Sequence, residues 1–247
     1  MADHSGAVPL PEDDLGGHSL IAIPARYGSS RLPGKPLLRL AGRTLLERVV
    51  AVAAQAAENV GQCEVVVATD DDRIADHAVA IGVAVAMTDP ALASGTKRVH
   101  AAMVQSATAP HTVVNLQGDA PFVPVDIVVQ VLRALKTQAA DVVTPVFQLD
   151  WERLDRLRAH KQTAPFSGTT CIRAADGRAI WFSKAIVPAI REEARLRQEA
   201  MSPVWQHIGL YGYSAAALGW FAGQSEPGQY ELLESLEQLR FLEHGRT

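Results

Sequence analysis

The chain has little of what disulfide-stabilised, zinc-binding or membrane-spanning proteins require. Only two cysteines occur among its 247 residues, Cys63 and Cys171, and neither has partners at metal-ligand spacing. We therefore expect no disulfide scaffold and no zinc site, and predict two buried thiols in a reducing cytoplasm. The longest unbroken apolar stretch runs from Ala78 to Met87 and contains Gly82, so it is too short to cross a bilayer.

An excess of positive charge is also lacking. The 23 Lys and Arg residues stand against 27 Asp and Glu residues, which gives a net charge of −4. No nucleic acid or anionic membrane is therefore expected as a partner, and any bound anion needs a local cluster of cations. Residues 1–18 have no basic segment followed by an apolar one, which predicts a flexible leader and not a secretory signal. The length of 247 residues predicts one large domain, over 19–247, and the hydrophobic share of 48% is enough to bury a substantial core.

Short apolar runs alternate with longer amphipathic stretches, a pattern that is typical of βαβ units. It predicts a doubly wound α/β fold with a mostly parallel sheet. The predicted strands are 20–24, 64–69, 83–87, 112–116, 141–145 and 208–213, and the predicted helices are 44–58, 73–81, 94–106, 126–137 and 230–244. Over about 146–210, arginine-rich stretches surround short β-like runs, which predicts an inserted subdomain or dimer arm.

Three cations crowd into the loop after the first predicted strand: Arg26, Arg31 and Lys35. Ligands of open parallel sheets bind beyond the carboxyl ends of strands, and a loop rich in glycine and serine offers backbone N–H groups to an anion. Mutual repulsion disfavours such a cluster unless a polyanion lies among the cations, and a triphosphate fits that requirement. The alternative is a basic turn exposed to water. The spacing matches neither the Walker A motif nor a dinucleotide fingerprint.

A second candidate site follows the strand at 112–116, in the segment Gln117-Gly-Asp119. Gly118 permits a tight turn, and Asp119 lies at the carboxyl end of the strand. A carboxylate there can hold Mg²⁺, which bridges phosphate oxygens; the alternative is a turn or helix-capping aspartate. The acidic run 70–72 fits a helix cap better than a metal site.

The ordered set of motifs resembles the 3-deoxy-manno-octulosonate (Kdo) cytidylyltransferases, also called CMP-Kdo synthetases. The motifs that carry the resemblance are the basic loop 23–36, Ala68-Thr-Asp70, Ser94-Gly-Thr-Lys-Arg98, Gln117-Gly-Asp119, Trp181-Phe-Ser-Lys-Ala-Ile-Val-Pro188, His207-Ile-Gly-Leu-Tyr-Gly-Tyr213 and Glu231-Leu-Leu-Glu-Ser-Leu-Glu-Gln-Leu-Arg240. They cover roughly residues 19–245 in the family's order.

The resemblance implies a nucleotidyltransferase fold, usually a homodimer, that couples CTP to Kdo with Mg²⁺ and releases pyrophosphate, for lipopolysaccharide synthesis. It assigns catalysis to Arg26, Arg31, Lys35 and Asp119, with Asp119 as the metal ligand. The implied nucleotide-binding residues are Ala25, Arg26, Ser29, Arg31, Lys35, Thr69, Asp70, Ser94, Gly95 and Arg98. The implied sugar-binding residues are Gln117, Lys184, His207, Tyr211, Glu234 and Gln238.

Several residues depart from the family's pattern. Ala120 and Lys97 stand where acids are common, and Lys184 stands where arginine is usual. A lysine can pair with a substrate carboxylate, but only as a point charge. The chain ends at Thr247, whereas family members usually continue to a second metal-binding aspartate, so we expect either a shortened chain or a metal held by Asp119 without that partner.

Four alternatives follow from these departures and from the residues themselves. The acceptor could be another acid, such as an amino-modified Kdo, a sialic-like acid or a phosphonate, or the chain could be a nucleotide-binding homologue without catalysis. His207 could be a core histidine bonded to backbone. The acids of the helix predicted at 230–244 could form a solvated face. No side chain stands out as general base.

Overall fold

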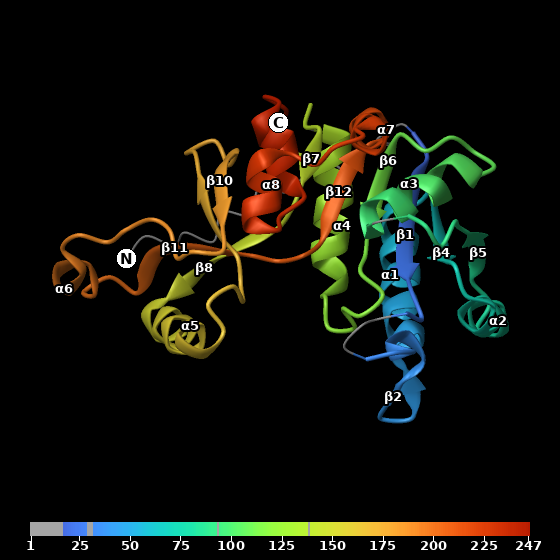
Figure 1. The fold of residues 1–247 in the computed structure, drawn as a ribbon, viewed down its shortest axis with the longest axis horizontal. Helices are drawn as coiled ribbons and strands as arrows, with labels where there is room; N and C mark the ends of the chain where they lie inside the picture. Colours follow the sequence, from blue (N-terminus) through green and yellow to red (C-terminus); the bar gives the residue numbers. More distant parts are fainter. Residues whose placement is uncertain (1–16, 29–31, 93, 138) are drawn as a thin grey trace.

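The computed structural model describes residues 17–28, 32–92, 94–137 and 139–247, which form two main sheets (Figure 1). The larger sheet has the strand order β5-β4-β1-β6-β12-β7. Its strands are β1 (Ser19–Ala25), β4 (Cys63–Thr69), β5 (Ala84–Met87), β6 (Thr112–Asn115), β7 (Val142–Val143) and β12 (Tyr211–Ser214). The first four in this order pair in parallel, and β12 runs antiparallel to both of its neighbours.

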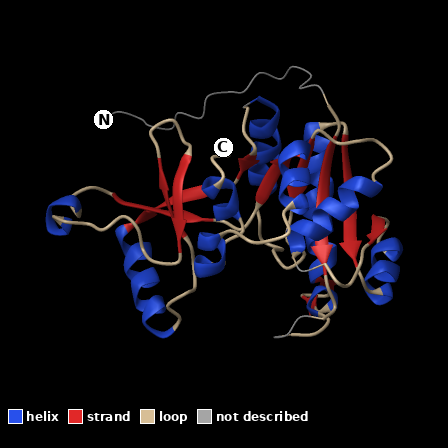
Figure 2. Ribbon diagram, turned by 45° about the horizontal axis from the view of Figure 1, so that its top comes forward, coloured by secondary structure: helices blue, strands red, loops and turns tan. Residues whose placement is uncertain are grey.

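Helices cover both faces of this sheet, which confirms the predicted doubly wound α/β fold (Figure 2). On one face, Ile21 and Ile23 of β1 pack against α1 (Leu45–Val60), α2 (Asp72–Ala80) and α4 (Val125–Thr137). On the other face, Leu20 and Ala22 pack against α3 (Gly95–Gln105), α7 (Ala215–Gly223) and α9 (Gln238–Glu243). Alternate residues of β1 thus supply two separate cores, as expected for a strand that is buried on both sides.

Side-chain caps start several of these helices where the sequence predicts them. Thr44 and Glu47 form a capping box at the start of α1. Asp71 accepts a hydrogen bond from the Arg73 N–H at 3.1 Å and caps α2, so one acid of the run 70–72 is a cap as predicted. Between the basic loop and α1 lie a short 3₁₀ helix (Lys35–Leu37) and the hairpin of β2 (Arg39–Leu40) with β3 (Arg43–Thr44).

The second sheet is antiparallel, with the order β10-β9-β11-β8, and lies beside the first (Figures 1 and 2). Its strands are β8 (Val146–Asp150), β9 (Thr170–Arg173), β10 (Ala179–Ser183) and β11 (Met201–His207). The helix α5 (Trp151–Thr163) packs on it through Leu154 and Leu157, and α6 (Glu193–Leu196) follows β10. This sheet occupies the segment that the sequence predicts to be inserted.

The prediction of one continuous helix over 230–244 was wrong. The structure has two short helices, α8 (Gln229–Glu234) and α9, separated at Ser235, which has a left-handed φ of 52°. The strand predicted over 208–213 is also displaced, because 208–210 connect β11 to β12. In the part of the chain that the structure describes, no helix is both long and apolar enough to cross a membrane.

Candidate functional site

The parallel pairing of β1 with β4 and β6 brings three loops to one edge of the large sheet. Ala25, the last residue of β1, pairs with Thr69 of β4, and Asn115 of β6 pairs with Ala22. The segments that follow these strands therefore meet, as the sequence predicts for an α/β sheet. Ser29 and Arg31, two predicted nucleotide-binding residues, lie outside the described residues.

Lys35 and Asp119 face each other across this edge. The Lys35 ammonium donates to Asp119 Oδ2 at 2.6 Å, and both side chains remain partly exposed. Gly118 lets the loop that carries Asp119 pack closely against β1, because a Cβ at position 118 would lie 2.8 Å from the carbonyl oxygen of Pro24. The two predicted catalytic residues are thus brought together, 84 positions apart in sequence.

Arg26 and Arg98 share the carboxylate of Asp70. Arg98 Nη2 lies 2.9 Å from Asp70 Oδ2, and Arg26 Nε lies 3.5 Å from the same oxygen. The Arg98 side chain has no exposed surface, whereas that of Arg26 is 44% exposed. The repulsion predicted among the loop cations is therefore offset within the chain, because Asp70 accompanies Arg26 and Asp119 accompanies Lys35.

The remaining predicted nucleotide residues surround the same edge. Ala25 and Thr69 are buried at the ends of their strands. Ser94 caps α3 by accepting a hydrogen bond from the Lys97 N–H at 3.3 Å, and a Cβ on Gly95 would lie 3.8 Å from the Pro24 ring. The N-terminus of α3 is therefore close to the end of β1, where its free N–H groups favour negative charge.

The predicted sugar residues other than Gln117 form two groups near the second sheet, held by hydrogen bonds and aromatic contacts. In the first, Glu234 of α8 accepts from the Ser183 hydroxyl at 2.8 Å and from the Lys184 backbone N–H at 2.7 Å. The Lys184 ammonium donates to Thr169 Oγ1 at 3.2 Å. Burial lowers the pKa of Lys184, and the nearby Glu234 carboxylate opposes that shift.

The second group centres on His207. Thr144 donates its hydroxyl proton to the Leu210 carbonyl at 2.7 Å, so the His207 Nε2, which is 2.7 Å from the same hydroxyl, must donate to it. This leaves the Nδ1 of a neutral His207 as an acceptor. Burial, with a smaller contribution from the positive charge of Lys184, lowers the pKa of His207 to about 4. The His207 ring is thus hydrogen-bonded to a side chain, that of Thr144, whereas the alternative of a core histidine predicts a hydrogen bond to backbone.

Aromatic contacts connect His207 to the next predicted sugar residues. The His207 and Tyr211 ring centroids are 5.3 Å apart, and Tyr211 donates its hydroxyl proton to Gln238 Oε1 at 3.2 Å. Burial raises the pKa of Tyr211. Gln117 donates to the side-chain oxygen of Asn115 at 3.2 Å and so lies at the end of β6.

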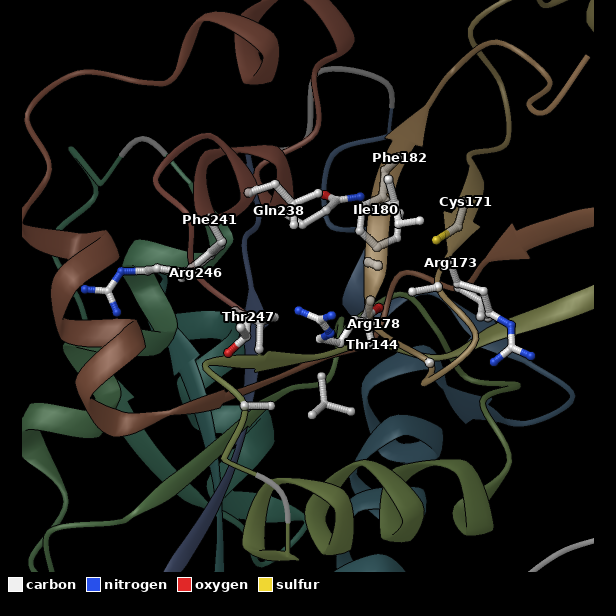
Figure 3. A pocket seen from close by; sticks show the side chains of 18 of the residues that line it. Thr144, Cys171, Arg173, Arg178, Ile180, Phe182, Gln238, Phe241, Arg246 and Thr247 are labelled. Atoms are coloured by element: carbon white, nitrogen blue, oxygen red, sulfur yellow. The ribbon is translucent and has the colours of Figure 1, made fainter.

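A cavity of about 740 Å³ lies elsewhere, between β7, the β9–β10 hairpin and α9 (Figure 3). Thr144, Arg178, Phe182, Gln238 and Phe241 are among the residues that line it. None of the described residues of the basic loop lines this cavity. Of the implied sugar-binding residues, Gln238 alone lines it. The cavity is therefore distinct from the edge of the large sheet where Lys35 and Asp119 meet.

Sequence reasoning missed Thr144 and Thr88. Thr144 holds His207, and Thr88 accepts a hydrogen bond from Arg98. Neither residue belongs to a recognisable motif, although both directly follow strands, which is the one signal that could have identified them. Among the residues that the structure describes, no group of three or more His, Cys, Asp or Glu side chains could hold a metal.

A doubly wound sheet whose carboxyl edge carries cations and a carboxylate defines a nucleotide-binding α/β protein. A family model described as cytidylyltransferase matches residues 20–247, and the chain belongs to this family. The resemblance to the Kdo cytidylyltransferases is confirmed by curated relatives of that name.

Two relatives named 3-deoxy-manno-octulosonate cytidylyltransferase illustrate the similarity. The relative from Maricaulis maris is 41% identical, over 92% of this chain and 84% of the relative. The relative from Xanthomonas campestris pv. campestris strain B100 is 39% identical, over 98% of this chain and 83% of the relative. A solved structure of CMP:2-keto-3-deoxy-manno-octonic acid synthetase complexed with CTP has a TM-score of 0.78 and 32% identity, and the match covers 93% of this chain and 87% of that one.

Proposed function

We propose that this chain is a cytidylyltransferase that joins CMP to Kdo, with release of pyrophosphate, for lipopolysaccharide synthesis. The observation that carries the proposal is the position of Arg26 and Lys35 at the carboxyl edge of the large sheet, in a chain that belongs to the cytidylyltransferase family. The similarity to a synthetase solved with CTP supports the choice of nucleotide.

In this reaction the anomeric hydroxyl of the sugar acid attacks the α-phosphorus of CTP and gives up its proton to solvent water, and the bond between that phosphorus and the bridging oxygen of pyrophosphate breaks. Such a transfer asks the protein chiefly for alignment and charge stabilisation. Arg26, Arg31 and Lys35 bind the triphosphate and stabilise the charge that develops on the leaving pyrophosphate. Ala25, Ser29, Thr69, Ser94 and Gly95 form the remainder of the nucleotide site, and Asp70 adjoins it through its ion pair with Arg26 without contacting the nucleotide itself.

Asp119 is the proposed ligand of a divalent cation, Mg²⁺. Its carboxylate fits this role because it is 50% exposed and lies beside the phosphate-binding cation Lys35. Mg²⁺ is commonly held by one or two carboxylates together with phosphate oxygens and water, so a single protein ligand suffices. When bound, the ion neutralises charge on the phosphates. Lys35 then exchanges its bond to Asp119 for one to the triphosphate.

The sugar acid binds between the two sheets, at Gln117, Lys184, His207, Tyr211, Glu234 and Gln238. Lys184 pairs with the acid's carboxylate as a point charge, and the free Nδ1 of His207 accepts from a sugar hydroxyl. Because an ammonium specifies carboxylate geometry less tightly than a guanidinium, an acceptor other than Kdo is the second candidate.

The segment 146–210 is the proposed contact of a homodimer. Phe166 is 77% exposed, Ile180 56% and Met201 40%, and large exposed apolar side chains are typical of interfaces. Sedimentation velocity should therefore give twice the monomer mass. The protein is proposed to act in the cytoplasm, without a nucleic-acid or membrane partner.

A pyrophosphate-release assay with Mg²⁺ tests the function. CTP is compared with ATP, GTP and UTP, and Kdo with an amino-modified Kdo, a sialic acid and a small phosphonate. The proposal expects release with CTP and Kdo above every other pair. Preference for another acid would reject Kdo but retain cytidylyl transfer, whereas CTP binding without release for any acid would indicate a homologue without catalysis.

A further inference from the structure

We propose that Arg98 is a positioning residue that acts through Asp70, and that it keeps the charge of Arg26 available for the phosphates of the nucleotide. The proposal deepens the function proposed above and rests on it. It differs from the assignment that the family resemblance implies, in which Arg98 belongs to the nucleotide-contacting residues themselves.

Arg98 is fixed from the protein interior. One guanidinium nitrogen donates to Thr88 Oγ1, and Thr88 in turn donates to the Thr69 carbonyl at 3.0 Å. The other terminal nitrogen holds Asp70 Oδ2 at 2.9 Å. Since Thr69 is the last residue of β4 and Asp70 follows it, these contacts fix the carboxylate relative to the sheet edge.

Arg26 approaches the same oxygen from the solvent side. Its Nε lies 3.5 Å from Asp70 Oδ2, longer than the 2.9 Å contact that Arg98 makes. Arg26 also donates to the Pro90 carbonyl at 3.4 Å. Both contacts of Arg26 are long for hydrogen bonds, so a phosphate oxygen can replace them at little cost.

The balance of charge explains why the buried arginine matters. Within the ion-paired triad, two guanidinium groups and one carboxylate leave a net charge of +1, and Arg26 presents it at the surface because Arg98 has no exposed side-chain surface. The nearby Asp89 carboxylate also acts on Arg98 but, in the described part of the chain, forms no ion pair with either arginine. Without Arg98, Asp70 would have Arg26 as its remaining ion-pair partner, and the pair would be neutral. An anion would then have to compete with Asp70 for Arg26.

A direct contact between Arg98 and the nucleotide makes a different prediction. The Arg98 Nε–H is buried and has no hydrogen-bond partner among the described residues, so it is the group that a nucleotide would have to reach. In that case Arg98 would be needed whatever residue occupies position 70. The two roles therefore differ in how a substitution of Asp70 acts on a substitution of Arg98.

The test is a double-mutant cycle of wild type, Arg98→Met, Asp70→Asn and the double variant, in which calorimetric titration measures the affinity for CTP. Arg98→Met should weaken CTP binding by about tenfold or more, since it leaves Asp70 to neutralise Arg26. Adding Asp70→Asn to Arg98→Met removes the competing carboxylate and should restore the affinity to within about threefold of wild type. An Arg98→Met/Asp70→Asn double variant that binds CTP as weakly as Arg98→Met would overturn the proposal.

A control variant keeps the outcome readable. Arg98→Lys retains the buried charge and should bind CTP within about threefold of wild type; a folded Arg98→Lys protein with a loss above about tenfold would indicate a specific guanidinium contact and also overturn the proposal. This variant decides the matter if Arg98→Met fails to fold.

Inorganic tripolyphosphate separates this proposal from the proposed function. A wild-type protein that binds tripolyphosphate but not CTP would refute the choice of nucleotide, and the same cycle would then be read with tripolyphosphate. A wild-type protein that binds neither would reject both proposals.

Discussion

Lys35 and Asp119 form an ion pair whose value for folding is small. Their side chains are 36% and 50% exposed, and pairs of this kind contribute about 0–1 kcal/mol. Lys35→Ala should therefore leave the thermal midpoint nearly unchanged while lowering kcat by about a hundredfold or more, because it removes a cation from the leaving pyrophosphate. Pyrophosphate release and a melting curve measure the two effects.

The matched control for that prediction is Arg39→Ala. Arg39 is an exposed cation of β2 that donates to the Gly42 carbonyl at 2.8 Å and belongs to no proposed site. Its removal changes the net charge as much as Lys35→Ala does. Equal losses of kcat in the two variants would show that net charge, and not the position of Lys35, governs turnover.

His207 gives the protein a defined dependence on pH. Burial places its folded pKa at about 4, below the value of about 6.5 for an unfolded chain. Between these values the unfolded chain binds a proton that the folded chain does not. The contribution of His207 to the free energy of unfolding should therefore be complete above about pH 6.5. It should fall as the pH decreases toward 4, by a total on the order of 3 kcal/mol.

Urea denaturation at a series of pH values measures this effect, with His207→Gln as the comparison. The glutamine can still donate to Thr144 but does not titrate, so the difference between the two proteins should shrink or reverse as the pH falls. The same exchange at the exposed His160 should leave the profile unchanged. A His207→Gln profile that parallels wild type from pH 7.5 to 4.5 would contradict the prediction.

The residues that local motifs mark could be placed from the sequence, but their partners could not. The basic loop and Gln117-Gly-Asp119 follow strands whose parallel pairing brings them together, so their common location is a consequence of topology. The hydrogen bond between Thr144 and His207 joins positions 63 residues apart, and that between Arg98 and Asp70 spans 28. Such contacts depend on packing and leave no periodic signal in the chain.

At the scale of elements, amphipathic periodicity identified helices that have one polar and one apolar face, and it missed α5 and α7. The segment Ala215–Gly223 contains no charged residue, so α7 has no polar face to reveal its period. The opposite holds for α5, which is largely polar and buries only a narrow stripe, with Trp151, Leu154 and Leu157 as its buried residues. Both patterns depart from the balanced face that predicts a helix.

The break between α8 and α9 has a testable cause at Ser235. A left-handed φ of 52° disfavours a residue with a Cβ, whereas glycine adopts it without that cost. Ser235→Gly removes this strain but makes the unfolded chain more flexible. The free energy of unfolding should therefore rise by about 0–1 kcal/mol. Ala51→Gly, at an exposed position inside α1, should instead lower it by about 1 kcal/mol.

Urea titration of both variants provides the comparison. If one continuous helix spanned 230–244, Ser235 would be an interior helical residue and Ser235→Gly would destabilise the protein much as Ala51→Gly does. Similar losses in the two variants would thus refute the observed break. The result matters for the site, because Glu234 and Gln238 lie on opposite sides of this turn and reach different partners.

At the scale of the whole molecule, the chain passes twice between the two sheets. It leaves the large sheet after β7 through Thr144 and Pro145, and it returns from β11 to β12 through residues 208–210. The Ile208 N–H donates to the Pro145 carbonyl at 3.0 Å, so a backbone hydrogen bond joins the two connecting segments. Thr144 adds bonds to Leu210 and His207. Its hydroxyl thereby connects the sheet junction to the proposed sugar site.

Thr144→Val preserves the shape of this side chain and removes both hydrogen bonds. The Leu210 carbonyl and the His207 Nε2–H would lose their partner in a partly buried position, which should cost about 1–3 kcal/mol of unfolding free energy. Because His207 would no longer be held, the KM for the sugar acid should rise more than the KM for CTP. Thr144→Ser keeps the hydroxyl and should retain both constants within about twofold. Steady-state kinetics with each substrate varied in turn measure this difference, and equal changes in the two KM values would show that the junction affects the enzyme as a whole and does not act through His207.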